Sequence, residues 1–400
     1  MKILQVNSVY PEKSTGKLTK LLHDGLLREG HESIVVYGRG PTAQGPGVIR
    51  LCPDWYGKAN SLLSRFTGLP YGGCLLSTLR LRRIILREKP DVVHLQCIND
   101  HFVNIPRLIS WLKERKISTV VTLHAEFMYT GNCGYAFACE KWKTGCHHCE
   151  RRYGATKSWF FDRTSTSWNR MYQAMQGFEE NCVVVPVSPW TQSRAMEGKI
   201  LKQFRFHTVL NGVDTEVIHR RKSDVRSELG IPEGPVLLNI SRKFSADPDD
   251  IKGGYFVYRL AERMPDATFL VAGMYEQDRN LPDNIRCLGF VSDQKKMAEF
   301  YSASDLTLML SKRETFSMPC AESLCCGTPV VGFRAGAPEQ ISLPEYSEFV
   351  EQGDLDGVER MIRRWIKKEL PREEIAKEAE RVYSSGTMVR NFLDVYRSML

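Results

Sequence analysis

Two glutamates, Glu314 and Glu322, bracket the segment of the chain whose residue types suggest chemistry most clearly. Between them stand Thr315, Phe316 and Ser317, with a proline two residues further on. Ser317 is a good helix N-cap and proline suits a first helical turn, so the N–H groups of this turn should form a cradle for an anion. Glu322, in that first turn, could accept hydrogen bonds from a ribose diol while Glu314 faces a sugar. The segment favours a sugar-diphosphate site; solvated surface acids are the alternative.

Two further residues stand where ligands of parallel sheets bind. His124 directly follows the apolar run Ser118–Leu123, which places it at the carboxyl edge of a predicted sheet. Gly16 lies on the first strand-to-helix loop and should let a donor or acceptor approach the backbone closely. A capped structural histidine and a helix-entry glycine are the alternatives. The edge position favours a functional role for His124.

Four cysteines fall within one glycine-containing stretch: Cys133, Cys139, Cys146 and Cys149. Four soft ligands at this spacing fit tetrahedral zinc without an open position, which predicts a structural metal rather than a catalytic one. Such a metal would order the loop 125–155 as a lid over the acceptor side. Four free thiols are the alternative, because the cytosol keeps cysteines reduced.

A basic amphipathic segment spans Leu75–Arg87, where leucines and isoleucines alternate with four arginines. This pattern fits an interfacial helix that meets anionic lipid. It equally fits a helix that buries its leucines in the domain and leaves its arginines in solvent, and that interpretation is the default.

Short runs of Val, Ile and Leu alternate with longer amphipathic stretches, and the pattern occurs twice along the chain. Each run fits a buried parallel strand, and two series of strands and helices predict two doubly wound α/β domains. The expected strands are Lys2–Val6, Ser33–Tyr37, Asp91–Leu95, Ser118–Leu123, Cys182–Val187, Val236–Ile240, Thr268–Ala272, Ile285–Leu288, Leu306–Leu310 and Pro329–Phe333.

The domain boundaries follow from a polar, turn-forming stretch that begins at Asn211-Gly212-Val213-Asp214. We expect an N-terminal domain over 1–214 and a C-terminal domain over 215–382. The apolar spacing within Met388–Leu400 predicts that a last helix, in 383–400, crosses back onto the N-terminal domain.

Composition and charge describe a soluble globular protein with a basic first half. Apolar residues make up 42% of the 400 residues and charged residues 26%, and the net charge is +8. Residues 1–190 hold 25 basic and 15 acidic side chains, which suggests an anionic partner such as nucleic acid, phospholipid or a diphosphate-linked acceptor. No apolar run reaches the roughly 20 residues that span a bilayer, and no signal sequence precedes the first strand. We therefore expect a cytoplasmic protein.

The Glu314–Glu322 segment resembles the Glu-x7-Glu signature of retaining glycosyltransferases of family 4, with Phe-x-x-Pro between the acids and Gly-Thr-Pro-Val-Val after them. The run Trp142-Lys-Thr-Gly-Cys146 resembles the exopolysaccharide branch of that family, near the colanic-acid transferases. The resemblance implies the GT-B fold, in which two Rossmann-like domains face each other across a cleft. It also implies a UDP- or GDP-sugar donor and transfer with retention.

Residue by residue, the resemblance assigns Arg242 and Lys252 to the donor diphosphate, alongside Gly16, the Thr315–Ser317 turn and Glu322. Lys243 could replace either cation, because extra residues lengthen this interval. His124 and Glu314 become the catalytic candidates. Cations beside the diphosphate make a catalytic divalent metal unnecessary.

The acceptor implied is a saccharide, free or linked to polyprenyl diphosphate, with peripheral contact at the cytoplasmic face of the inner membrane. A GT-B hydrolase or epimerase is the alternative enzyme. A zinc-containing nucleic-acid-binding protein is the most distant alternative: the segment carrying the phosphate cradle lies in the less basic half, and no aromatic stacking platform stands out, so we expect no nucleic-acid partner.

Overall fold

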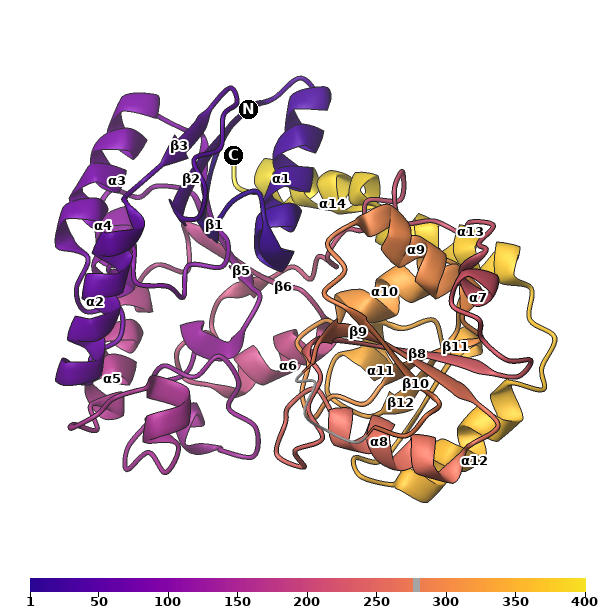
Figure 1. Cartoon of the computed structure of the whole chain (residues 1–400). Helices are drawn as coiled ribbons and strands as arrows, with labels where there is room; N and C mark the ends of the chain where they lie inside the picture. Colours follow the sequence, from indigo (N-terminus) through magenta and orange to yellow (C-terminus); the bar gives the residue numbers. More distant parts are fainter. Residues whose placement is uncertain (276–280) are drawn as a thin grey trace. The chain divides into compact units, whose positions relative to one another are not determined.

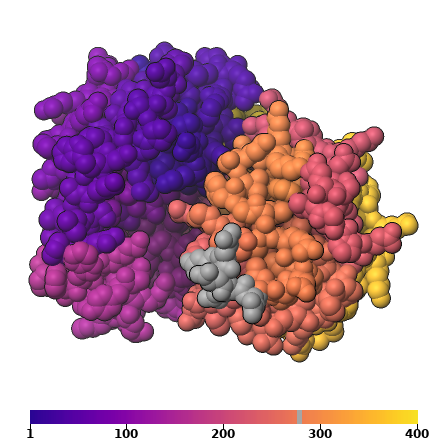
Figure 2. Space-filling model, in the orientation of Figure 1, coloured from indigo at the N-terminus to yellow at the C-terminus, as the bar shows by residue number. Residues whose placement is uncertain are grey.

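A computed structural model describes residues 1–275 and 281–400 of the chain. The chain divides into two compact units, and the colours of Figures 1 and 2 follow the sequence through them from indigo to yellow. The first unit comprises Met1–Leu210 together with Met388–Leu400, and the second comprises Asn211–Thr387. None of the helices in the described ranges combines the length and the apolar character needed to cross a membrane.

The first unit is built on a seven-stranded parallel sheet with the order β3-β2-β1-β4-β5-β6-β7. Its central strands are buried on both faces, which explains why they read as continuous apolar runs. The strand order reverses beside β1, so the loops after β1 and β4 diverge at the carboxyl edge. The strands are β1 (Lys2–Val9), β2 (Glu32–Arg39), β3 (Val48–Arg50), β4 (Val92–Leu95), β5 (Thr119–Leu123), β6 (Cys182–Pro186) and β7 (Arg205–Phe206).

Helices cover both faces of this sheet (Figure 1). On one face, α1 (Lys13–Arg28) packs beside the last helix, α14 (Ser385–Arg397), since Gly25 of α1 is in close contact with Val389. The main core of the unit fills the other face. Five helices lie on that side: α2 (Asp54–Thr67), α3 (Leu75–Glu88), α4 (Ile105–Glu114), α5 (Thr164–Met175) and α6 (Pro189–Glu197).

The second unit has a six-stranded parallel sheet with the order β10-β9-β8-β11-β12-β13. Helices α8 and α12 contribute to the apolar core on one face, while α9, α10 and α13 pack together on the other (Figure 1). The strands are β8 (Val236–Lys243), β9 (Thr268–Met274), β10 (Ile285–Gly289), β11 (Leu306–Met309), β12 (Val330–Phe333) and β13 (Ser347–Val350). The helices are α7 (Val225–Glu228), α8 (Gly254–Arg263), α9 (Gln294–Ala303), α10 (Met318–Cys325), α11 (Pro338–Ile341), α12 (Leu355–Trp365) and α13 (Arg372–Tyr383).

The predicted fold class is confirmed, because each unit is a parallel sheet covered by helices on both faces. All ten predicted strands are present within a few residues of their expected limits. The sequence analysis missed β3, β7 and β13, which have two to four residues and stand at sheet edges. Such strands carry too few buried residues to produce an apolar run.

Candidate functional site

An ion pair at the carboxyl edge of the second sheet joins two of the predicted site residues. Lys252, in the loop after β8, donates from Nζ to Oε1 of Glu314, in the loop after β11, at 2.6 Å. The Glu314 side chain is buried, whereas that of Lys252 is 35% exposed. A cation and a carboxylate that were predicted to serve one ligand therefore lie in direct contact.

The two loops meet because the residue after Lys252 is a glycine. Gly253 has a φ of +74°, and a Cβ on it would lie 2.0 Å from the carbonyl oxygen of Leu310 at the end of β11. Lys312 N–H also donates to the Ile251 carbonyl at 2.8 Å. Only glycine permits both this backbone conformation and this approach. The close backbone approach at Gly253 therefore holds Lys252 beside Glu314.

The backbone of Glu314 is held by the segment that follows β12. Its N–H donates to the Ala335 carbonyl at 2.9 Å, and its own carbonyl accepts from Ala337 N–H at 3.2 Å. The Glu339 carboxylate in turn accepts from the N–H groups of Ala335 and Gly336. The sequence analysis did not find this brace, although its Gly-Ala-Pro-Glu run has the character of a tight turn before a helix.

The turn between the two glutamates differs from the prediction in one respect. Ser317 occupies the N-cap position of α10, but its hydroxyl makes no capping hydrogen bond and lies 3.7 Å from the Met309 sulfur. Its φ of +82° is rare for a residue with a side chain, and such strain concentrates at functional loops. Thr315 and Phe316 are buried like Ser317. Because the first N–H groups of a helix lack acceptors within it, the α10 N-terminus keeps the character of an anion site.

Glu322 lies one turn deeper in α10 than predicted, since the helix begins at Met318 and its first turn contains no acid. Its Oε2 accepts a hydrogen bond from the Tyr301 hydroxyl of α9 at 3.0 Å. Burial and the nearby Glu322 carboxylate raise the pKa of Tyr301 well above its ordinary value, so the hydroxyl remains a donor at neutral pH. Tyr301 therefore orients Glu322, a role that a lone tyrosine in an amphipathic stretch does not reveal.

Arg242 and Lys243 both stand exposed at the end of β8. Either side chain therefore emerges at the strand end that precedes the Lys252 loop.

His124 follows β5 in the first unit and joins a chain of side-chain hydrogen bonds. Its Nε2 lies 3.0 Å from Oε1 of Gln96, and Gln96 donates from its amide nitrogen to Gln5 at 3.2 Å. Gln96 Oε1 is thus an acceptor, which assigns the His124 proton to Nε2. Burial lowers the pKa of His124 to about 4, so the ring is neutral at physiological pH. It can hydrogen-bond a ligand but does not carry a charge.

Gly16 lies in the first turn of α1. A Cβ there would lie 3.2 Å from the Pro11 carbonyl carbon and 3.3 Å from the Val9 carbonyl oxygen. The close approach seen in the structure is between α1 and its own preceding loop. A role for Gly16 toward a ligand stays a prediction.

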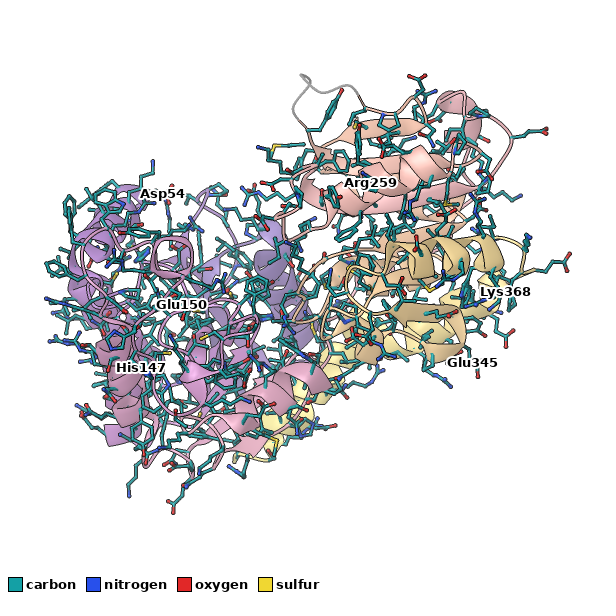
Figure 3. All side chains as sticks on the ribbon, turned by 90° about the horizontal axis from the view of Figure 1, so that it is seen from below. Asp54, His147, Glu150, Arg259, Glu345 and Lys368 are labelled. Carbon is teal, nitrogen blue, oxygen red and sulfur yellow. The ribbon has the colours of Figure 1, made fainter. Side chains whose placement is uncertain are left out.

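The predicted zinc site finds no support in the structure. Within residues 1–275 and 281–400, no group of three or more His, Cys, Asp or Glu side chains could hold a metal ion. Cys133, Cys139, Cys146 and Cys149 instead line a cavity of about 410 Å³, together with His147 and Glu150, which Figure 3 labels. Burial raises the pKa of Cys133 and of Cys146 to about 12, as expected of protonated thiols.

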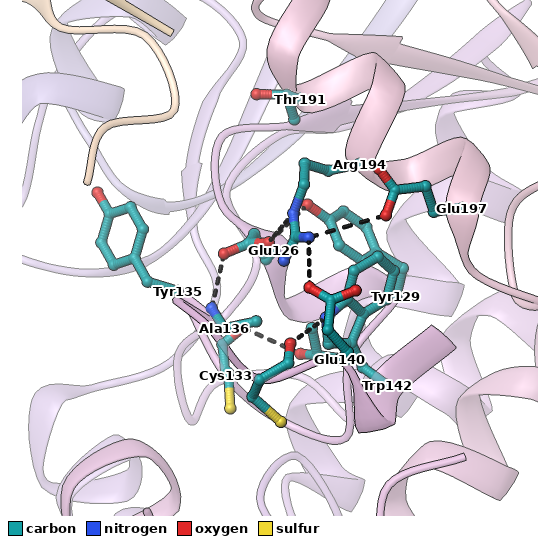
Figure 4. A network of polar contacts seen from close by, with 12 residues as sticks. Glu126, Tyr129, Cys133, Tyr135, Ala136, Glu140, Trp142, Thr191, Arg194 and Glu197 are labelled. Carbon is teal, nitrogen blue, oxygen red and sulfur yellow. Dashed lines mark hydrogen bonds and ion pairs between the residues drawn. The ribbon is translucent and has the colours of Figure 1, made fainter. Parts of the chain in front are cut away.

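A buried carboxylate orders the cysteine-rich loop (Figure 4). Glu126 is fully buried and accepts from Ala136 N–H at 2.6 Å and from the Tyr129 hydroxyl at 3.2 Å. Arg194 of α6 donates to the same carboxylate at 3.4 Å and to Glu140 at 3.1 Å, and its guanidinium lies 4.6 Å from the centre of the Trp142 ring. In the sequence, the feature that could have indicated this network is the acid Glu126, two residues after His124.

A second cavity, of about 630 Å³, lies in the first unit at the carboxyl ends of β1 and β2. The sequence analysis did not predict it. Its charged lining is mixed, with Asp54, labelled in Figure 3, among the acids. The acids, cations and histidine of the lining are Glu12, Lys13, Arg39, Asp54, Lys58, Arg65, Asp100 and His101.

Comparisons with known proteins agree with this arrangement. Residues 16–217 match the family model described as Glycosyltransferase Family 4, and residues 257–382 match that of Glycosyl transferases group 1. A putative colanic acid biosynthesis glycosyl transferase, WcaC, of Escherichia coli K12 is 22% identical over the whole of both chains. An N-acetyl-alpha-D-glucosaminyl L-malate synthase of Bacillus anthracis is 30% identical over 56% of this chain and 61% of its own.

Solved structures extend the comparison to the fold. Sucrose-phosphate synthase of Thermosynechococcus elongatus superimposes with a TM-score of 0.70 at 15% identity, covering 100% of this chain and 99% of its own. Anabaena HepE in complex with UDP-glucose gives a TM-score of 0.64 at 16% identity, with both chains fully covered. The structural similarity therefore includes both units.

Proposed function

Because the chain belongs to glycosyltransferase family 4, we propose that it transfers a sugar from a UDP- or GDP-sugar to a saccharide acceptor, with retention of anomeric configuration. Membership of the family supports the class of reaction, and the similarity to the solved GT-B structures named above supports the fold. The similarity to WcaC supports a place in bacterial surface-polysaccharide synthesis. The identity of the donor, the identity of the acceptor and the retention of configuration are what we propose here.

The observation that carries the proposal is the contact between Lys252 and Glu314 beside the α10 N-terminus. When the bond from the anomeric carbon to the diphosphate oxygen breaks, negative charge grows on the leaving diphosphate. Lys252 and the helix N–H groups would neutralise that charge, as a metal ion does in other transferases. Arg242 would add a second cation.

The two glutamates would serve different parts of the donor. Glu314 would accept hydrogen bonds from sugar hydroxyls, and Glu322, oriented by Tyr301, would accept from the ribose diol. In a front-face reaction the acceptor hydroxyl bonds to the anomeric carbon, and the leaving phosphate oxygen takes the hydroxyl proton. Such a route needs no protein nucleophile. His124, held neutral, would contribute hydrogen bonding to the sugar rather than charge.

For the acceptor we propose the 630 Å³ cavity of the first unit, whose volume suits a saccharide. Its four cations, Lys13, Arg39, Lys58 and Arg65, also suit a diphosphate that links a saccharide to polyprenol. Such an acceptor is anchored in lipid, so we propose that the reaction takes place at the cytoplasmic face of the inner membrane.

Thermal unfolding with UDP, GDP and ADP tests the donor proposal, because a ligand that binds only the folded state raises the apparent stability. We expect UDP or GDP to raise the melting temperature of the wild type and to act much less on Glu322→Ala. Equal stabilisation of both proteins would contradict the assigned ribose contact. Products formed with and without a saccharide acceptor then separate transfer from hydrolysis or epimerisation of the donor.

A further inference from the structure

Helix α2 turns its apolar face away from the core. Ser64 is its only buried residue, whereas Trp55, Leu62, Leu63 and Phe66 are between 46 and 68% exposed. These positions recur at helical spacing and form one stripe. An amphipathic helix in a globular protein normally turns such a stripe inward. The outward orientation of α2 therefore calls for a partner.

A loop places three more aromatic residues beside this stripe. Trp159, Phe160 and Phe161 are between 41 and 59% exposed. The ring centre of Phe66 lies 4.9 Å from that of Trp159 and 5.8 Å from that of Phe160. Trp159 N–H donates to the Arg65 carbonyl at 2.9 Å, which fixes the loop on α2. We call these seven residues of α2 and the loop the apolar platform.

Cations border the apolar platform. The Arg65 guanidinium lies 5.8 Å from the Trp159 ring centre, and that of Arg163 lies 5.2 Å from the Phe161 ring centre. Lys157 is exposed in the same loop. Two acids lie nearby: Asp162 is engaged by the N–H groups of Cys149 and Thr164, and Asp54, next to Trp55, pairs with Arg50. The edge of the platform is therefore basic.

The apolar platform is continuous with the proposed acceptor cavity, because Leu62 belongs to both and Arg65, at the border of the platform, also lines the cavity. Exposed aromatic residues with arginine and lysine at their margin match the boundary between lipid headgroups and acyl chains. We propose that the apolar platform docks on an anionic phospholipid bilayer, which brings the mouth of the cavity to the lipid surface. This inference rests on the proposed function in one respect, which is that the acceptor is linked to lipid.

This surface differs from the helix that the sequence pattern singled out. In α3, Leu81, Ile84 and Ile85 are buried against the core, while Leu76 and Leu86 remain exposed. The helix therefore buries part of its apolar face in the domain, and contact of its exposed leucines with lipid stays a prediction. The platform on α2, by contrast, buries none of its apolar stripe.

Vesicle co-sedimentation of the full chain, without donor or acceptor, tests the proposal. We expect binding to vesicles that mix phosphatidylglycerol with phosphatidylcholine, weakening with salt, and at least tenfold weaker binding to phosphatidylcholine alone. Leu63→Ser/Phe160→Ser should lower the partition coefficient about tenfold or more. Phe290→Ser, which changes a 67% exposed aromatic residue of the second unit, is the matched control and should bind like the wild type. Unchanged unfolding curves would show that both variants are folded.

Three results would overturn the proposal. The first is equal vesicle binding by the wild type and Leu63→Ser/Phe160→Ser. The second is a wild-type dimer that this double variant dissociates, since the platform would then bind a second copy of the chain. The third is loss of transfer to a water-soluble acceptor in the double variant, which would assign these residues to the acceptor site. Vesicle binding by a protein without transferase activity would instead contradict the proposed function alone.

Discussion

The loops that follow β5 and β11 both set a glutamate beside a cation, yet the two pairs differ in their surroundings. Glu126, after β5, is fully buried and accepts hydrogen bonds from Ala136, Tyr129 and Arg194. Glu314, after β11, contacts Lys252, whose side chain is about one-third exposed. A carboxylate whose acceptor sites are filled by the protein stabilises a loop. A carboxylate beside a partly solvated cation can exchange that partner for a ligand.

The largest effect should come from Glu126→Ala. Removing one partner of a buried ion pair leaves the other charge uncompensated, at a cost of about 3–5 kcal/mol. Arg194 keeps Glu140, so we expect the lower end of that range in urea-induced unfolding. Glu140→Ala, at a side chain that is half exposed, should cost about 1 kcal/mol or less. Similar losses for the two variants would contradict the claim that the buried Glu126 carboxylate stabilises this loop.

Lys252→Ala should instead lower turnover, by about a hundredfold. Loss of one group that stabilises developing negative charge has an effect of this order. The variant should destabilise the fold less than Glu126→Ala does, because the Lys252 side chain is partly solvated. Steady-state transfer rates measure the loss of turnover. Lys243→Ala, at the last residue of β8, is the matched control. If Lys243→Ala is impaired and Lys252→Ala is not, the alignment of these cations with the family is shifted.

Glu322→Ala should weaken nucleotide binding about tenfold, the effect of one or two lost hydrogen bonds to a charged acceptor. Titration calorimetry with the nucleotide measures it. Tyr301→Phe removes only the hydroxyl that orients Glu322, so we expect a smaller loss in the same direction. A larger loss in Tyr301→Phe would mean that the tyrosine itself contacts the nucleotide.

The effect that is smallest at neutral pH is that of two buried histidines, because it appears only below about pH 6.5. Burial, with a contribution from His124, lowers the pKa of His94 to about 3, and burial lowers that of His124 to about 4. In the unfolded chain both would take up protons near pH 6.5, so the unfolded state binds more protons below that pH. The free energy of unfolding should be unaffected by these groups above about pH 6.5, and each histidine should lower it by up to about 1.4 kcal/mol per pH unit between pH 6 and pH 4. His94→Gln should flatten this slope, whereas His147→Gln, at an exposed ring, should leave it unchanged.

Sequence reasoning succeeded where one local pattern determines the structure. The apolar runs predicted both sheets, and the Glu-x7-Glu segment led to the loop in which Glu314 meets Lys252. Sequence reasoning failed where a contact between residues far apart in the sequence determines the structure. Tyr301 reaches Glu322 from another helix, and Arg194 reaches Glu126 across 68 positions. The cysteine spacing predicted a metal site, which finds no support among the described residues, because spacing alone does not fix the distances between four thiols.

The return of α14 to the first unit has a consequence for synthesis. Val389 packs on Gly25, and the Tyr396 hydroxyl lies 2.7 Å from Nδ1 of His94, so the first sheet is incompletely covered until these residues exist. The ribosome makes all of 211–387 before it reaches them. The unit that is translated first is therefore the last to close, because its α1 surface stays uncovered until the final residues of the chain have been made.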